Sequence, residues 1–208
     1  MKDNQSMDKP SFKDNGIFDP PKPYGDWKIN HRRTAYENAW IEVGHYEVTN
    51  PSGNEGVYGV VHFKNIAVAI VALDEAQNVH LVGQFRFTLN SYEWEIPEGG
   101  CPANEAPLEA AQRELLEECG LEASEWKEIL RMATSNSVTD ELSITYLATN
   151  LTQSEARPED TENLTQRCIP LDDALSMIDR GEIKDALSVA SLLKVSRDLL
   201  TNNLHRSL

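Results

Sequence analysis

Three glutamates near the middle of the chain, Glu114, Glu117 and Glu118, have the spacing of one helix face. Residues three and four positions apart lie on the same side of a helix, so these carboxylates point the same way within one turn. The cluster precedes Gly120 at the C-terminal end of the predicted helix, where the macrodipole disfavours each anion by roughly 0.3–1 kcal/mol. A divalent cation would reverse that balance, since Mg²⁺ selects oxygen ligands. A solvated acidic helix face is the alternative.

The residues before the cluster extend this pattern. From Gly99 the sequence gives glycine, five residues, Glu105, seven residues and then RELLEECGL, from Arg113 to Leu121. It resembles the Nudix hydrolase signature, G-x5-E-x7-R-E-U-x-E-E-x-G-U with U apolar, at every specified position. The segments QFRF, EIPEGG, TSNSVTDE and IDRGEIKDALSVASLL are similar to the ADP-ribose pyrophosphatase branch of that family. One departure is TSNS, where family members often have a proline-containing segment of the PSPG type.

The resemblance implies both a fold and an activity. The expected fold is α+β, a Nudix-type α/β/α sandwich with a mixed sheet and a small N-terminal β subdomain. The expected activity is Mg²⁺-dependent hydrolysis of the pyrophosphate bond of nucleoside diphosphate sugars, with Mn²⁺ as a substitute metal. ADP-ribose, giving AMP and ribose 5-phosphate, is the first substrate expected. The alternatives are GDP-mannose or another nucleotide sugar, a dinucleoside polyphosphate, and a non-catalytic sensor of ADP-ribose-like ligands.

The same resemblance assigns the metal ligands. It implies that Glu114 and Glu118 are the principal ligands, and that Glu117 is a further ligand or the general base. The backbone carbonyl of Glu98, just before the first glycine of the signature, is implied as another ligand.

Other residues are implied to orient ligands, activate water or hold substrate. Arg113 and Glu105 would orient the metal-binding carboxylates. Glu141, in the loop after the signature, matches the position that ADP-ribose pyrophosphatases use to activate water, with a solvated acid in a turn as the alternative. From its chemistry, Arg86 is a candidate phosphate contact through its guanidinium, with an ordinary surface arginine as the alternative. Glu95 would support the metal shell or the ribose.

Four aromatic residues are candidates for stacking on a base. Trp27 is the one assigned to substrate binding here, and core packing is the alternative for all of them. The others are Tyr36, Trp40 and Tyr92.

A helix and several strands must position these side chains. A helix is predicted at Pro107–Cys119, because Pro107 suits a first turn and Gly120 supplies a stop. The run IAVAIVAL is apolar on both faces and is predicted as a central strand. Further strands are predicted within 27–48 and at 57–63, 79–87, 125–133 and 142–149, with a turn at 50–56, a loop at 134–141 and two closing helices at 171–180 and 185–200.

Composition restricts the class of protein. The 208 residues are 40% hydrophobic and 25% charged, as in a globular protein, and acids outnumber bases 34 to 19 for a net charge of −15. Such a surface repels phosphate backbones, so no nucleic-acid partner is expected. A pyrophosphate substrate is compatible with this charge when metal ions neutralise its oxygens.

The remaining expectations concern domains and location. We predict a mobile leader at 1–24, an N-terminal strand segment for dimerisation or substrate contact at 25–56, and a hydrolase domain at 57–205. The three cysteines indicate reduced thiols in a cytosol. The longest apolar run is too short to span a bilayer, so a cytoplasmic protein with no membrane partner is expected. The resemblance implies a homodimer.

Overall fold

The computed structural model describes residues 15–154 and 164–201, and these form two compact units. The described residues up to Lys64, together with Ser135–Glu141, make up the N-terminal unit. Asn65–Thr134 and the described residues from Leu142 onward make up the main unit. We call Ser135–Glu141 the inserted loop, because it packs with the N-terminal unit while the strands on either side of it belong to the main unit.

The N-terminal unit is a four-stranded antiparallel sheet with the strand order β1-β2-β3-β4. Its small core contains Ile29, Tyr46 and Val48. The predicted turn between β3 and β4 is confirmed, since Gly53 has a φ of 86° and donates its N–H to the Asn50 carbonyl. The strands are β1 (Gly16–Tyr24), β2 (Trp27–Glu37), β3 (Ile41–Thr49) and β4 (Glu55–Phe63).

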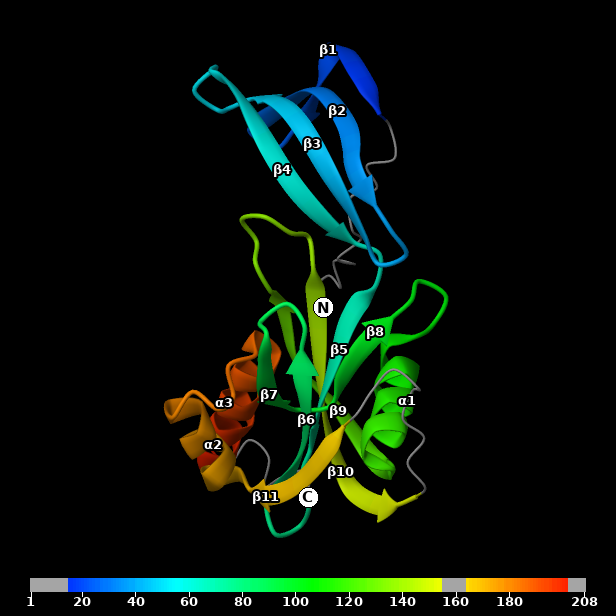
Figure 1. The fold of residues 1–208 in the computed structure, drawn as a ribbon, viewed down its shortest axis with the longest axis vertical. Helices are drawn as coiled ribbons and strands as arrows, with labels where there is room; N and C mark the ends of the chain where they lie inside the picture. Colours follow the sequence, from blue (N-terminus) through cyan, green and yellow to red (C-terminus); the bar gives the residue numbers. More distant parts are fainter. Residues whose placement is uncertain (1–14, 155–163, 202–208) are drawn as a thin grey trace. The chain divides into compact units, whose positions relative to one another are not determined.

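The main unit contains a mixed sheet and a smaller antiparallel sheet (Figure 1). In the mixed sheet, of order β8-β5-β10-β9, β5 and β10 are parallel and the other pairs are antiparallel. The smaller sheet has the order β11-β6-β7. The strands are β5 (Ile66–Ala72), β6 (Asn78–Arg86), β7 (Ser91–Glu95), β8 (Glu98–Cys101), β9 (Leu121–Ala133), β10 (Leu142–Gln153) and β11 (Thr165–Pro170).

Strand β5 lies in the centre of the main unit, as its two apolar faces predicted. Successive side chains of a strand point to opposite faces, so β5 supplies two separate cores. One face packs against α1 (Pro107–Cys119), and the other packs against α2 (Leu171–Asp179) and α3 (Ala186–Leu200). Full burial of each large apolar side chain contributes about 1.5–3 kcal/mol. The first face carries Val68, Ile70 and Ala72, and the second carries Ala69, Val71 and Leu73.

Helix α1 begins and ends where the sequence predicted. Pro107 occupies the first turn, and Gly120, with a φ of 65°, forms a left-handed C-cap. The predicted α+β class, with a mixed sheet and a separate N-terminal β-sheet, is confirmed. Among the described residues, no helix is long and apolar enough to cross a membrane.

The observed organisation differs from the predicted domain boundaries. The described part of the predicted leader contains β1, and residues 1–14 lie outside the described residues. Prolines suggested a mobile leader, but β1 is an edge strand, which needs ladder hydrogen bonds on one side only. Residue 57, the predicted start of the hydrolase domain, lies inside β4, and the compact units separate at Lys64.

Candidate active site

Helix α1 presents the signature glutamates because its opposite face is fixed in the core. Its inward side packs on β5, which sets the rotation of the helix about its axis. Glu118 is itself buried, at 3% exposure, whereas Glu114 and Glu117 lie at the edge of the buried face. The buried apolar positions are Ala110, Ala111, Leu115 and Cys119.

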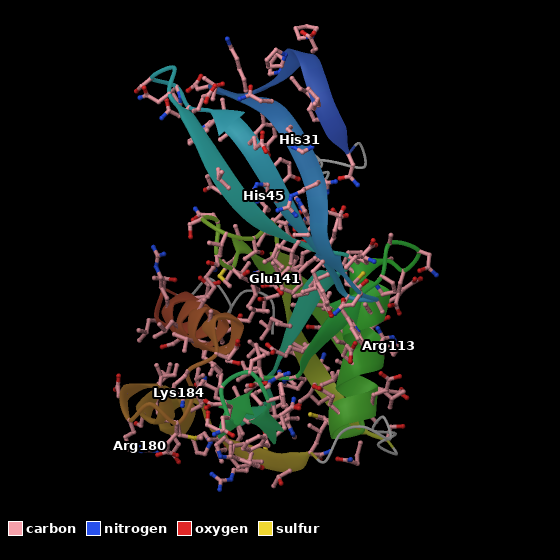
Figure 2. All side chains as sticks on the ribbon, turned by 45° about the horizontal axis from the view of Figure 1, so that its top comes forward. His31, His45, Arg113, Glu141, Arg180 and Lys184 are labelled. Carbon is pink, nitrogen blue, oxygen red and sulfur yellow. The ribbon has the colours of Figure 1, made fainter. Side chains whose placement is uncertain are left out.

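Arg113, labelled in Figure 2, is the centre of the first charged cluster. Its guanidinium donates to both oxygens of Glu105, at 3.1 and 3.0 Å, to Glu114 at 2.8 Å and to Glu117 at 3.0 Å. It also donates to the Gly100 carbonyl at 3.1 Å. The hydrogen bonds from Arg113 hold the pKa of Glu105 below its usual range. One side chain therefore fixes the positions of three carboxylates of the signature.

Arg86 is the centre of the second charged cluster. Its Nε donates to both oxygens of the buried Glu95, at 2.8 and 3.0 Å, and its Nη2 donates to Glu98 at 2.8 Å. Glu118 joins this cluster, because its Oε2 accepts the backbone N–H of Glu98 at 3.1 Å. The hydrogen bonds with Glu95 raise the pKa of Arg86. The guanidinium that was predicted to contact phosphate thus lies between two carboxylates.

The side chain of Glu98 is a part of the site that the sequence did not identify. Only its backbone carbonyl was predicted as a ligand, yet its Oε2 is buried and has no hydrogen-bond partner among the described residues. Burial, with the neighbouring carboxylates of Asp185 and Glu95, raises the pKa of Glu98 well above its usual range. A buried, unpartnered carboxylate oxygen is costly unless a proton or a cation compensates it.

Asp185, in the segment IDRGEIKD, is a second site residue that the sequence did not identify. It is the N-cap of α3, where its carboxylate accepts the Ser188 N–H at 2.7 Å. Its charge contributes to the raised pKa values of both Glu98 and Arg86. An aspartate directly before an apolar helical repeat is an N-cap signal, which could have identified the residue but not its neighbours.

The donor chemistry of the two clusters fits a divalent metal. Carboxylates clearly outnumber guanidiniums, and hard carboxylate oxygens are the ligands of Mg²⁺. No group of three or more His, Cys, Asp or Glu side chains in the described ranges already has a metal-binding arrangement. Five of these acids are instead ion-paired with the two guanidiniums. The acids are Glu95, Glu98, Glu105, Glu114, Glu117, Glu118 and Asp185.

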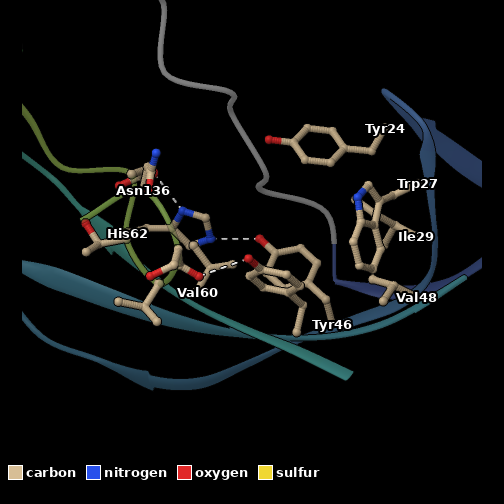
Figure 3. A pocket seen from close by; sticks show the side chains of 13 residues that line it. Tyr24, Trp27, Ile29, Tyr46, Val48, Val60, His62 and Asn136 are labelled. Atoms are coloured by element: carbon tan, nitrogen blue, oxygen red, sulfur yellow. Dashed lines mark hydrogen bonds and ion pairs between the residues drawn. The ribbon is translucent and has the colours of Figure 1, made fainter. Parts of the chain in front are cut away.

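Two predicted site residues, Glu141 and Trp27, lie in the N-terminal unit. Glu141 ends the inserted loop, and its N–H donates to Thr139 Oγ1 at 2.7 Å. Trp27 packs edge-to-face on Tyr58, with ring centroids 5.8 Å apart, and lines a cavity of about 260 Å³ (Figure 3). The cavity also contains Tyr24 and polar groups of the inserted loop.

The other aromatic candidates do not line this cavity. Tyr36 is 55% exposed and Trp40 is 68% exposed. Tyr92 belongs to the main unit and packs edge-to-face on Trp94, with ring centroids 5.7 Å apart.

Comparisons with known proteins agree with the signature. The model of the NUDIX domain matches residues 63–191. The chain is 35% identical over 175 residues to an ADP-ribose pyrophosphatase of Mycobacterium tuberculosis, covering 82% of this chain and 83% of that protein. It is 32% identical over 142 residues to an ADP-ribose pyrophosphatase of Bacillus subtilis, covering 67% and 76%.

A solved structure supports the fold assignment. The crystal structure of an ADP compounds hydrolase matches with a TM-score of 0.77 and 22% identity, over 88% of this chain and 98% of that one. The domain match spans more than half of the chain, and it contains the whole signature with both charged clusters. The chain therefore belongs to the Nudix hydrolase family and is a pyrophosphohydrolase.

Proposed function

We propose that this protein hydrolyses the pyrophosphate bond of nucleoside diphosphate sugars with Mg²⁺, and that ADP-ribose, giving AMP and ribose 5-phosphate, is its main substrate. The observation that carries the proposal is the excess of carboxylates around Arg86 and Arg113, in a complete Nudix signature. Two relatives that match most of the chain are named ADP-ribose pyrophosphatases, which supports the choice of substrate.

The signature acids are the proposed metal ligands. Glu114 and Glu118 would hold Mg²⁺, or Mn²⁺ in its place, with Glu117 and the Glu98 carbonyl as further ligands. A bound ion would neutralise phosphate oxygens and lower the pKa of the attacking water. Arg113 keeps the Glu114 and Glu117 carboxylates beside one another, which lowers the cost of collecting like charges at one place.

The second cluster is the proposed phosphate contact. The Arg86 side chain is 35% exposed, and the buried Glu95 fixes the plane of its guanidinium. A planar guanidinium matches the geometry of phosphate oxygens. Glu95 would then support the site, as predicted from the sequence, by orienting Arg86.

The proposed general base is Glu141, with Glu117 as the other candidate. The resemblance to the ADP-ribose pyrophosphatase branch supports Glu141, which follows the signature at the position that those enzymes use to activate water. Trp27 is the proposed contact for the base of the nucleotide, because it lines a cavity with other aromatic rings.

A substrate screen tests the proposed function. The protein is incubated with Mg²⁺ and, separately, ADP-ribose, GDP-mannose and a dinucleoside polyphosphate, and phosphate is measured before and after phosphatase treatment. Turnover highest on ADP-ribose is expected. Faster turnover of either other compound would replace the substrate assignment, and tight ADP-ribose binding without turnover would indicate a sensor.

Glu118→Gln tests the metal assignment within that screen. It keeps the size of a buried side chain and removes its charge, so activity should fall at least about 100-fold with the fold intact. Glu109→Gln is the matched control on the same helix, because that exposed carboxylate accepts the Ala106 N–H at 3.4 Å and pairs with no guanidinium among the described residues. A Glu118→Gln variant with the activity of the wild type would refute the assignment of Glu118 as a metal ligand.

A homodimer is the proposed assembly. The resemblance to the ADP-ribose pyrophosphatase branch supports it, with the N-terminal strands as the contact surface. Light scattering at several protein concentrations should give twice the 23.3 kDa mass of one chain. The mass of a single chain at every concentration would refute it.

A further inference from the structure

The inserted loop is attached to strand β4 by backbone hydrogen bonds. The Val61 N–H donates to the Val138 carbonyl at 2.8 Å, and the Asp140 N–H donates to the Val61 carbonyl at 3.2 Å. Tyr58 adds a side-chain bond, from its hydroxyl to the Ser137 carbonyl at 2.9 Å. A loop that leaves and re-enters the main unit is therefore held in the N-terminal unit by β4.

The side chain of Asp140 makes the strongest part of this attachment. Its Oδ1 accepts the Phe63 N–H at 2.9 Å, and its Oδ2 lies 2.7 Å from Nδ1 of His62. The Asp140 and His62 side chains are only 17% and 15% exposed. Hydrogen bonds to a charged partner at low exposure are stronger than neutral ones in water.

The attachment continues into the sheet through a chain of buried polar groups. Nε2 of His62 lies 2.7 Å from the Tyr46 hydroxyl, which accepts from Arg32 Nε at 3.0 Å. Arg32, at 2% exposure, is also paired with Glu42. Dashed lines in Figure 3 mark the bonds on either side of His62.

The donor and acceptor groups of Arg32, Tyr46 and His62 fix the direction of the hydrogen bonds between them. Arg32 can only donate, so the Tyr46 oxygen accepts from it and turns its own hydrogen toward Nε2 of His62. His62 then carries its proton on Nδ1 and donates it to the Asp140 carboxylate. Every member is satisfied in this arrangement, and each depends on the next. His62 therefore links Tyr46, in the core of the sheet, to Asp140 in the loop.

We propose that His62 is a positioning residue that holds the inserted loop on β4 and thereby places Glu141, the residue after Asp140. The inference rests on the proposed role of Glu141 as general base. The base must stay within hydrogen-bond reach of the attacking water, and a displacement of about 1 Å can lower a rate by about 100-fold. His62 acts through the loop and does not itself touch the reacting atoms.

The first test is structural and independent of turnover. His62→Phe keeps an aromatic ring and removes both hydrogen bonds, so amide hydrogen exchange at Phe63 and Asp140 should become about tenfold faster or more. If His62→Phe does not fold, Asp140→Ala is measured in its place, and the same faster exchange is expected at Phe63. His45→Phe is the matched control. His45 precedes Tyr46 in β3, so its side chain points to the face of the sheet opposite to the one where Tyr46 meets His62.

The second test is kinetic. His62→Phe should lower kcat by about 10- to 100-fold and leave KM nearly unchanged. In the double variant with Glu141→Gln, His62→Phe should lower kcat by less than about a further twofold. The effects of two residues that act through one group are not additive.

The outcomes separate the inference from the proposed function. Unchanged exchange at Phe63 and Asp140 would overturn the inference, and so would losses in kcat that multiply in the double variant. Full activity of Glu141→Gln would also overturn it, and would return the base role to Glu117. A wild-type protein that turns over none of the screened substrates would refute the proposed function instead, and the exchange comparison would still decide whether His62 holds the loop.

Discussion

Gly99 lies directly against the carboxylate of Glu114. A Cβ built on Gly99 would stand 2.1 Å from Glu114 Cδ and 2.2 Å from its Oε1, far inside van der Waals contact. The first glycine of the signature is therefore needed for space, since the backbone of β8 and a carboxylate of α1 occupy the volume that any side chain would fill.

Gly99→Ala should lower activity without unfolding the protein. The added methyl group displaces the flexible end of Glu114, and the loss of backbone freedom in the unfolded chain offsets part of the strain. We expect kcat/KM to fall about 10- to 100-fold with little change in Tm. In the control variant, Gly100→Ala, the new Cβ would meet the Asn65 amide at 2.9 Å instead, so activity should fall much less. Equal losses in the two variants would contradict this account.

Mg²⁺ should raise the thermal stability of the protein. A ligand that binds only the folded state stabilises it by about 2.7 kcal/mol at a concentration of 100 times Kd. The excess of carboxylates around Arg86 and Arg113 is the proposed binding site for the ion. Differential scanning calorimetry with Mg²⁺ or EDTA should show a higher Tm with the metal, and Glu118→Gln should reduce the shift. A Tm that Mg²⁺ leaves unchanged would count against the site.

The Glu105–Arg113 pair should stabilise the protein only above acidic pH. Arg113 holds the folded-state pKa of Glu105 below the unfolded value of about 4.3. The contribution of the pair to the free energy of unfolding is thus fully present above the unfolded pKa of Glu105. It is lost as the pH falls through the lower, folded pKa. Glu105→Gln should cost about 1 kcal/mol at pH 7 and make the acid limb of a urea-denaturation profile shallower.

The comparison for Glu105 is Glu109→Gln, on the same helix but away from a guanidinium among the described contacts. It should leave the acid limb as in the wild type. Identical profiles of stability against pH for the wild type and Glu105→Gln would show that this ion pair does not contribute to the loss of stability in acid.

One of the three cysteines should react quickly with a thiol reagent in the native protein. Cys168 is exposed, whereas Cys101 and Cys119 are buried. Burial raises the pKa of Cys119 to about 12, so its reactive thiolate is scarce at pH 8. Labelling should give one fast equivalent in the native state and three after denaturation, and Cys168→Ser should remove the fast one. Two fast equivalents would contradict the observed burial of Cys101 in β8 or of Cys119 in α1.

Local sequence was enough to predict the signature helix. Its periodicity, Pro107 and Gly120 are all read within one short segment, and the structure places the helix at the same residues. Strand β5 was equally clear, because a run of apolar residues on both faces fits only a central position. The strand β1 was missed since its prolines resemble a linker, and only pairing with β2 makes it ordered.

The site needed more than local pattern. Sequence spacing brought Glu114, Glu117 and Glu118 onto one face, but it could not show that Arg86, Glu98 and Asp185 come from three separate segments to the same cluster. Nor could spacing show that Glu98 contributes a buried side chain. Such neighbours depend on how β6, β8 and the start of α3 pack together.

The sequence by itself determined the family of this protein and the helix face that we propose binds metal, because both are encoded by residue spacing within a few turns. The tertiary structure alone decided how that helix face is supported. It placed the carboxylate of Glu114 against Gly99, and it assigned the loop that carries Glu141 to the N-terminal unit through His62 and Asp140. The physical reason is range: helix periodicity acts between neighbours in the chain, whereas buried charges and hydrogen bonds depend on segments that meet only after folding.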